Sequence, residues 1–274
     1  MRIVRFSALQ DAGFGKDPHY GVINDNDQIL VLKGDPIFGG ITPSESKIAL
    51  SDVKILAPVL PRSKVVCVGK NYADHAAEMN SAVPEEPIIF LKPNTSVVGP
   101  HDVIQWPGMA ERVDHEVELA IVISRICKDV PVEKVNDVIF GYTIANDVTA
   151  RDLQTKDGQW SRAKGFDTFC PLGPWIETDF LPATQKIEAR VNGEVKQSST
   201  LDQMIFNVPR IINFISSVMT LLPGDVIITN EAKAFSANSD KSLPALVLFE
   251  GTVTPAAVGQ ATAFLQTIKS QPLV

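Results

Sequence analysis

Three carboxylates, Asp114, Glu116 and Glu118, alternate with apolar residues through residues 113–123. Successive side chains of a β-strand point to opposite faces, so a strand here would gather the three acids on one face, roughly 7 Å apart. Crowded, partly buried carboxylates repel one another and take up protons unless their charge is compensated. A divalent cation bound through oxygen atoms supplies that compensation. The same pattern also fits an exposed edge strand whose acids are simply hydrated.

A second acidic position follows another apolar segment. Residues 139–145 form a mostly apolar run that ends in Asn146 and Asp147. A carboxylate at the end of a buried strand is held rigidly, as a ligand needs to be. Arg151 follows Asp147 by four residues and Gln154 follows Arg151 by three, so all three would share one side of a helix. Alternatively, Asp147 caps a helix and Arg151 is a surface residue.

The composition narrows the class of protein. The 274 residues carry a net charge of −7, and 45% of them are hydrophobic. A nucleic-acid-binding protein would normally carry a basic face. No apolar run approaches the ~18 residues that span a bilayer. The three cysteines, Cys67, Cys127 and Cys170, lie within or beside apolar runs, which predicts buried thiols. We expect a cytoplasmic enzyme with neither a nucleic-acid nor a membrane partner.

The elements that would position these residues are mostly short strands. Residues 1–60 read as a small N-terminal β module with a hairpin around residues 24–27, and the prolines at 58 and 61 mark a joint. Residues 61–274 would form the catalytic domain. Further strands are expected at 64–68, 88–91, 116–123, 138–144, 186–191 and 225–229, and helices at 72–79, 132–136 and 208–220. This order predicts a β-rich α+β fold.

Six stretches, in this order and spacing, resemble the fumarylacetoacetate hydrolase family: GKNYADHAAEM from residue 69, IFLKP from 89, DHEVEL from 114, GYTIANDVTARDLQ from 141, AKGFDTF from 163 and TLLPGD from 220. The resemblance implies a mixed β-roll, a homodimer and a Mg²⁺ or Mn²⁺ ion. It also implies that Glu116, Glu118 and Asp147 are the metal ligands, with Asp114 outside the ligand set.

The resemblance further implies a small 2-oxo acid substrate, similar to an acylpyruvate or oxaloacetate. Lys164 would stabilise the enolate that forms, and Arg151 and Gln154 would hold the substrate carboxylate. His75 and Glu78, neighbours on a short helix, would activate water. The implied reaction is a hydrolase or lyase cleavage of a C–C bond through a metal-stabilised enolate. The alternatives are an isomerase or tautomerase of 2-hydroxy-diene-dioates, and a metal-binding family member with impaired catalysis.

The chain departs from the family pattern over residues 230–274. Relatives continue with a Thr-Gly-Thr-Pro turn beside the substrate carboxylate. Here Thr229 matches the first threonine, but Asn230 replaces the glycine, and a Ser/Thr/Ala-rich tail follows. A divergent ending and an altered reading frame both fit this tail. Either would affect substrate binding, while the implied metal ligands lie upstream.

Overall fold

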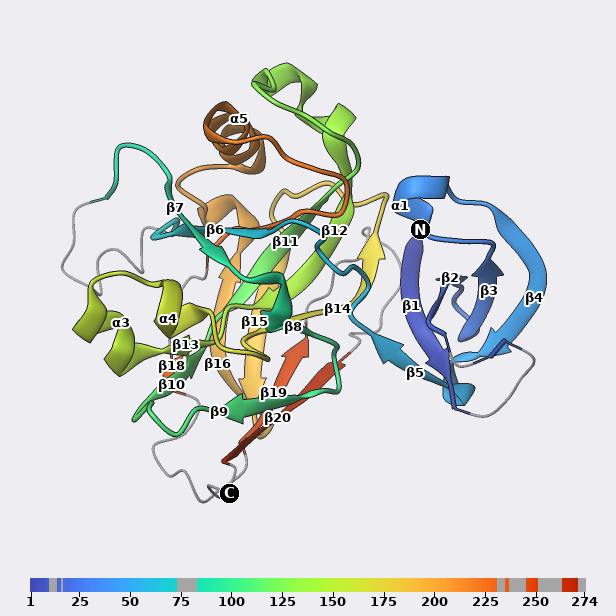
Figure 1. Ribbon diagram of the computed structural model, residues 1–274, viewed down its shortest axis with the longest axis horizontal. Coiled ribbons are helices and arrows are strands. Elements are labelled where there is room, and N and C mark those ends of the chain that lie inside the picture. The colour runs from blue at the N-terminus through green and yellow to red at the C-terminus, as the bar shows by residue number, and fades with distance from the viewer. Residues whose placement is uncertain are drawn as a thin grey trace.

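The structure is a computed structural model that describes residues 1–9, 14–15, 17–72 and 83–230. It also describes the backbone of three later strands, β18 (Phe235–Ser236), β19 (Ala245–Glu250) and β20 (Ala263–Ser270). A small N-terminal module lies on one side of the molecule, and the helices α3 and α4 lie on the opposite side (Figure 1). The expected helix at 72–79 falls outside the described residues.

The N-terminal module is a set of antiparallel strands. It contains β1 (Arg2–Ala8), β2 (His19–Ile23), β3 (Gln28–Leu32), α1 (Pro36–Gly39), β4 (Pro43–Ala49), η1 (Leu50–Asp52) and β5 (Val53–Leu56). The predicted hairpin is present, because β2 and β3 pair around residues 24–27. The Asn24 side chain closes this turn by accepting hydrogen bonds from the backbone N–H groups of Asn26 and Gln28.

A long sheet runs from this module through the centre of the molecule. Its order is β4-β3-β2-β1-β14-β12-β11-β17-β6-β7. The central strands are β6 (Val65–Gly69), β7 (Ile88–Lys92), β11 (Val117–Ile123), β12 (Ile139–Asn146), β14 (Cys170–Glu177) and β17 (Val226–Ile228). Every residue of β11 is buried between β12 and β17, which makes this strand a rigid support for the acidic residues beside it.

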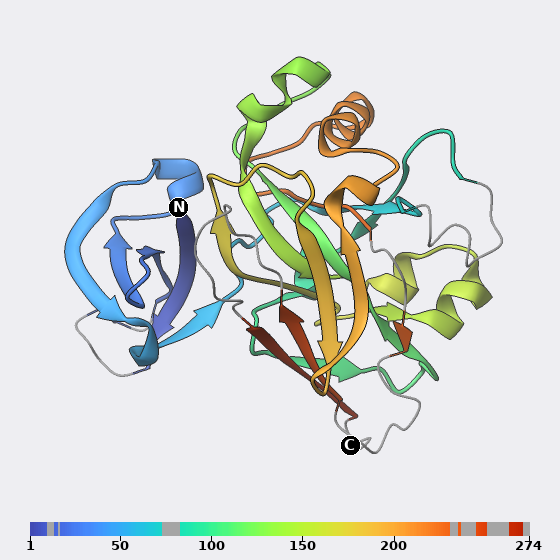
Figure 2. The same cartoon turned by 180° about the vertical axis from the view of Figure 1, so that it is seen from behind.

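Two smaller sheets complete the described structure. The first contains β13 (Thr149–Ala150), β10 (Val113–His115) and β18. The second has the order β16-β15-β19-β20-β9, with β9 (Val103–Trp106), β15 (Lys186–Val191) and β16 (Glu194–Thr200). A short strand, β8 (Val97–Val98), pairs with β14. Figure 2 shows the dark red C-terminal strands β19 and β20 beside the other strands of this second sheet. The tail therefore contributes β18 to the first small sheet and β19 and β20 to the second.

The longest described helix, α5 (Val208–Val218), confirms the helix expected at 208–220. Asn207 caps it by accepting a hydrogen bond from the backbone N–H of Arg210, and Pro209 fits its first turn. Ile211, Ile212 and Ile215 are fully buried on one side. Burial of each isoleucine stabilises the fold by about 1.5–3 kcal/mol.

The other helical segments are short. They are η2 (Asn94–Ser96), η3 (Val132–Val138), α3 (Arg151–Asp157), α4 (Ser161–Lys164) and η4 (Leu201–Gln203). The helix expected at 132–136 is thus a 3₁₀ helix. Among the described helices, none has the length and apolar character needed to span a membrane. The predicted β-rich α+β fold is confirmed, with strands outnumbering helices along the described chain.

Candidate metal centre and active site

The acidic strand predicted at 116–123 is broken at its first residue. β10 ends at His115 in one of the small sheets, and β11 begins at Val117 in the long sheet, so Glu116 lies at the break. Asp114, Glu116 and Glu118 are at most 1% exposed. The alternative of hydrated acids on an exposed edge strand is therefore wrong.

Glu116, Glu118 and Asp147 come together as predicted. One carboxylate oxygen from each lies within 4.8 Å of the other two. The backbone fixes two of them directly, since the Asp147 N–H donates a hydrogen bond of 2.9 Å to the Glu116 carbonyl oxygen. The capping alternative for Asp147 is wrong, because α3 begins at Arg151 with Ala150 as its N-cap.

The chemistry of this donor set fits a divalent cation. Three buried carboxylates offer hard oxygen ligands within the span of a single ion, as Mg²⁺ and Mn²⁺ require. Their assignment as metal ligands stays a prediction.

Two buried lysines approach the same carboxylates. Lys164 Nζ lies 2.5 Å from Glu116 Oε2 and 2.6 Å from Asp147 Oδ2. Lys92 Nζ lies 2.5 Å from Asp147 Oδ1 and donates a second hydrogen bond to the Val148 carbonyl oxygen. Sequence reasoning gave Lys92 no role, although a lysine that ends an apolar strand just before Pro93 was a usable signal.

Arg151 connects the metal centre to the neighbouring helix. Its guanidinium donates to Asp114 Oδ2 at 2.8 Å, to the Glu116 carboxylate and to Gln154 Oε1 at 2.7 Å. Asp114 is also bound through both of its oxygens by Arg112, at 2.9 and 3.0 Å. Two arginines therefore bind Asp114, which is not one of the three clustered carboxylates. The family resemblance likewise implied that Asp114 lies outside the ligand set.

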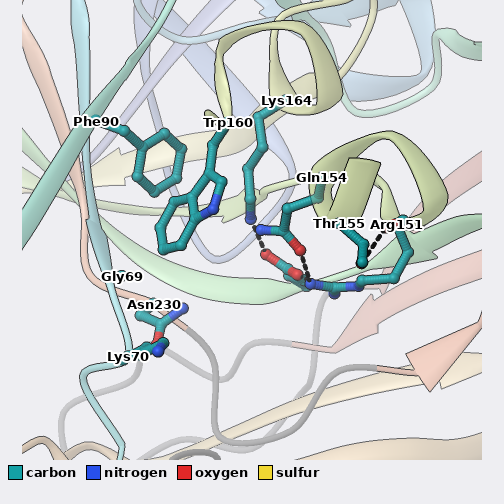
Figure 3. Close-up of a pocket in the computed structure, with 10 residues that line it drawn as sticks. Gly69, Lys70, Phe90, Arg151, Gln154, Thr155, Trp160, Lys164 and Asn230 are labelled. Atoms are coloured by element: carbon teal, nitrogen blue, oxygen red, sulfur yellow. Dashed lines mark hydrogen bonds and ion pairs between the residues drawn. The ribbon is translucent and has the colours of Figure 1, made fainter. Parts of the chain in front are cut away.

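Glu116, Arg151, Gln154 and Lys164 line a cavity of about 210 Å³. Phe90 and Trp160 form one wall, with their rings edge to face and their centroids 5.1 Å apart. A Cβ atom on Gly69 would lie 2.5 Å from the Trp160 ring, so the glycine allows the indole to take this position. Figure 3 shows Lys70 and Asn230 across the cavity from Arg151.

Asn230 lines the cavity, whereas its neighbour Thr229 does not. Thr229 is fully buried, and its hydroxyl has no hydrogen-bond partner among the described residues. Asn230 lines the cavity instead, and its backbone N–H donates to the Glu118 carboxylate. Asn230 has φ +79°, a conformation that favours glycine and that asparagine tolerates best among other residues. This explains how asparagine can stand where the family resemblance implies a glycine. The substrate-binding role of Thr229 stays a prediction.

The remaining residues considered in the sequence analysis are the His75 and Glu78 pair and the three cysteines. His75 and Glu78 lie outside the described residues, so their predicted role stays untested. Cys67 and Cys170 are fully buried as expected, and burial raises the pKa of Cys67 well above its usual value and that of Cys170 to about 12. Cys127 is only partly buried, and burial raises its pKa as well. All three are free thiols, and their raised pKa values do not suit a nucleophile, because attack requires the thiolate.

Comparison with known proteins identifies two matching families and several relatives of this chain. The fumarylacetoacetate (FAA) hydrolase C-terminal family matches residues 64–230, and a family described as Rv2993c-like, N-terminal, matches residues 1–58. Protein Rv2993c of Mycobacterium tuberculosis is 56% identical over 195 residues, which cover 70% of this chain and 73% of that protein.

Two further relatives carry names that describe an activity. The mitochondrial oxaloacetate tautomerase Fahd2a of Rattus norvegicus is 48% identical over 183 residues, which cover 65% of this chain and 58% of that protein. The crystal structure of a 5-carboxymethyl-2-hydroxymuconate delta-isomerase from Mycobacterium smegmatis aligns with 99% of this chain and 100% of its own, at 40% identity and a TM-score of 0.84. The match over residues 64–230, with the carboxylate and lysine arrangement inside it, means that the chain belongs to the fumarylacetoacetate hydrolase family.

Proposed function

We propose that this protein is a divalent-metal-dependent enzyme that forms and protonates the enolate of a small 2-oxo dicarboxylic acid. The charge of the site is the observation that carries the proposal. Four buried carboxylates, Asp114, Glu116, Glu118 and Asp147, are matched by four cationic side chains around them, Lys92, Arg112, Arg151 and Lys164. With Lys70, which also lines the cavity, a bound dication would leave an excess of positive charge, which favours a dicarboxylate over a monocarboxylate substrate.

The chain offers separate groups for the two ends of such a substrate. Arg151 and Gln154 line the cavity together and would hold the carboxylate next to the 2-oxo group. Lys70, which lines the opposite side, would attract the distal carboxylate. The Phe90 and Trp160 rings would exclude water from the carbon chain between them.

Glu116, Glu118 and Asp147 would hold Mg²⁺ or Mn²⁺, which when bound supplies a Lewis acid that polarises the 2-oxo group. Lys164 would donate a hydrogen bond to the oxygen at C2, where negative charge develops. Because Glu116 and Asp147 hold the ammonium from two sides, Lys164 is already oriented before the reaction starts.

Among the reactions that this enolate can undergo, we propose isomerisation as the first candidate. Conversion of an enol to its keto form breaks one O–H bond at C2 and forms one C–H bond at C3, and it needs no attacking water. The names of the tautomerase and delta-isomerase relatives support this order. Cleavage of a C–C bond, by a hydrolase or decarboxylase, is the second candidate. The His75 and Glu78 pair in the sequence favours hydrolysis, because this reaction needs an activated water.

A substrate panel with metal controls tests the proposal. Oxaloacetate, fumarylpyruvate and acetylpyruvate would be assayed with Mg²⁺, with Mn²⁺ and with EDTA, following enol, keto and cleavage products. We expect the two dicarboxylates to react faster than acetylpyruvate, and EDTA to abolish the reaction. His75→Ala and Glu78→Ala would retain most isomerisation but lose hydrolysis.

The controls separate the metal centre from the acidic surface. Glu116→Ala and Asp147→Ala should lose both metal and turnover, whereas Glu111→Ala, at an exposed position, should lose neither. Full activity in EDTA would refute the metal requirement. Metal binding without turnover of any 2-oxo acid would identify a catalytically silent member of the family. The homodimer implied by the resemblance also stays a prediction, which light scattering would check.

A further inference from the structure

The break between β10 and β11 is closed by two side-chain amides. The Glu116 N–H donates a hydrogen bond of 3.0 Å to Asn146 Oδ1, and the Val117 N–H donates one of 2.9 Å to Gln197 Oε1. Asn146 comes from β12, directly before Asp147. Gln197 comes from β16, in a different sheet. The backbone at Glu116 is therefore held from two sheets at once.

The orientation of the Gln197 amide follows from its partners. The Val117 N–H can only donate, so the Gln197 atom that it reaches must be the carbonyl oxygen. The same oxygen lies 3.1 Å from His115 Nδ1, which must then carry a proton. One buried oxygen thus holds residues 115 and 117, the two neighbours of Glu116 in the chain. Gln197 is 2% exposed and His115 is fully buried, so water does not replace these contacts.

We propose that Gln197 is a positioning residue for the metal centre. By fixing both neighbours of Glu116, it sets the direction in which the Glu116 carboxylate leaves the chain, towards Glu118 and Asp147. The inference rests on the proposed metal centre, because its consequence is a change in metal affinity. Groups that orient metal ligands typically change metal affinity by about ten- to a hundredfold when they are removed.

The same contact joins the metal centre to the C-terminal strands. β16 pairs with β15, and β15 pairs with β19 through residues 189–191. Gln197 is therefore one point at which the sheet completed by the tail contacts the chain that carries Glu116. The tail can act on the centre through this sheet without contributing a ligand.

The test is calorimetric titration of Mn²⁺ into metal-free protein carrying Gln197→Met, which keeps the length of the side chain and removes the acceptor. We expect the dissociation constant for Mn²⁺ to rise by about tenfold or more. Gln203→Met is the matched control, since it makes the same change at an exposed glutamine and should leave the constant unchanged. Thermal unfolding of each metal-free protein separates affinity from stability, because a purely structural role would lower Tm and leave the constant unchanged.

Each result of the titration either supports or overturns the positioning role of Gln197. An unchanged dissociation constant for Gln197→Met, or an equal loss in Gln203→Met, overturns the inference. If Gln197→Met does not fold, His115→Phe removes one of the two donors while keeping a ring in place. That variant should also weaken Mn²⁺ binding, and unchanged binding would overturn the inference. If the wild-type protein binds no Mn²⁺, the proposed metal centre fails and the positioning role falls with it.

Discussion

Lys164 occupies the space between two carboxylates that are proposed to bind metal. Its ammonium forms ion pairs with Glu116 and Asp147 and so offsets their charge in a buried site before any metal ion binds. The same position makes Lys164 a competitor of the metal for those oxygens. The residue therefore has opposite effects on metal binding and on catalysis.

Substitution of Lys164 should separate these two effects. In Lys164→Met we expect Mn²⁺ to bind more tightly, because the carboxylates lose the competing cation. We expect kcat to fall by about a hundredfold or more, because the oxygen at C2 loses its donor. Titration calorimetry and steady-state assays would measure the two changes. Lys156→Met, at an exposed position of α3, should change neither, and weaker metal binding in Lys164→Met would contradict this role.

Gly69 controls the position of the aromatic wall. The Cβ of Gly69→Ala would lie 2.5 Å and 2.8 Å from two atoms of the Trp160 ring, so the indole must move. We expect the KM for oxaloacetate to rise by about tenfold, since the substrate loses a well-placed wall. Gly34→Ala is the control, because nothing lies within 4 Å of its added Cβ. A double variant with Trp160→Ala should show no further effect of the alanine at 69.

At the scale of elements, the sequence predicted the strands and helices that are specified by a pattern of neighbouring residues. The strand at 186–191 and the start of α5 were predicted to the residue, because alternation and helical spacing are patterns of neighbouring residues. The break at Glu116 was missed because the alternation continues across it. Its cause lies in Asn146 and Gln197, which are far from it in sequence.

Two further omissions have similar physical causes. β14 was missed because Pro171 and Pro174 argue against a strand inside a sheet, yet β14 pairs with both β12 and β1. Lys92 was missed because a single lysine is normally a surface residue, and only its contact with Asp147 gives it a role. The proximity of Glu116, Glu118 and Asp147 was predictable because the three carboxylates lie in two short motifs.

Ionisation of Tyr142, in strand β12, should make the unfolding free energy depend on pH in the alkaline range. Tyr142 packs edge to face against Phe180, and burial raises the pKa of its phenol to about 12. The unfolded phenol ionises near pH 10, so its contribution is complete below about pH 10 and is lost as pH rises towards 12. The shift corresponds to at most about 3 kcal/mol of unfolding free energy.

The variant Tyr142→Phe isolates this contribution. Urea unfolding would be measured for both proteins at about pH 8 and about pH 11. We expect the wild type to lose more stability than Tyr142→Phe between the two values, because only the wild type has this phenol to ionise. The comparison at the lower pH provides the control for changes in packing. Equal losses in the two proteins would show that Tyr142 ionises as readily when folded as when unfolded.

At the scale of the whole molecule, the tail holds the five-stranded sheet together. β19 pairs with β15, and β20 pairs in parallel with β9 through residues 103–106. The family match ends at residue 230, but the described strands continue the domain beyond it. Local sequence could not predict this arrangement, because β9 and β20 are separated by most of the chain.

Deletion of residues 245–274 would therefore expose the edges of β15 and β9. Unpaired edge strands lose their hydrogen bonds and offer sites for association with other chains. We expect a Tm lower than that of the full chain, aggregation visible by light scattering, and weaker Mn²⁺ binding because β16 and Gln197 lose the support of β19. Deletion of residues 271–274 alone removes no described strand and should leave all three measurements unchanged. If the longer deletion matches the wild type in Tm and in metal affinity, β19 and β20 do not support the centre, and the fold closes without them.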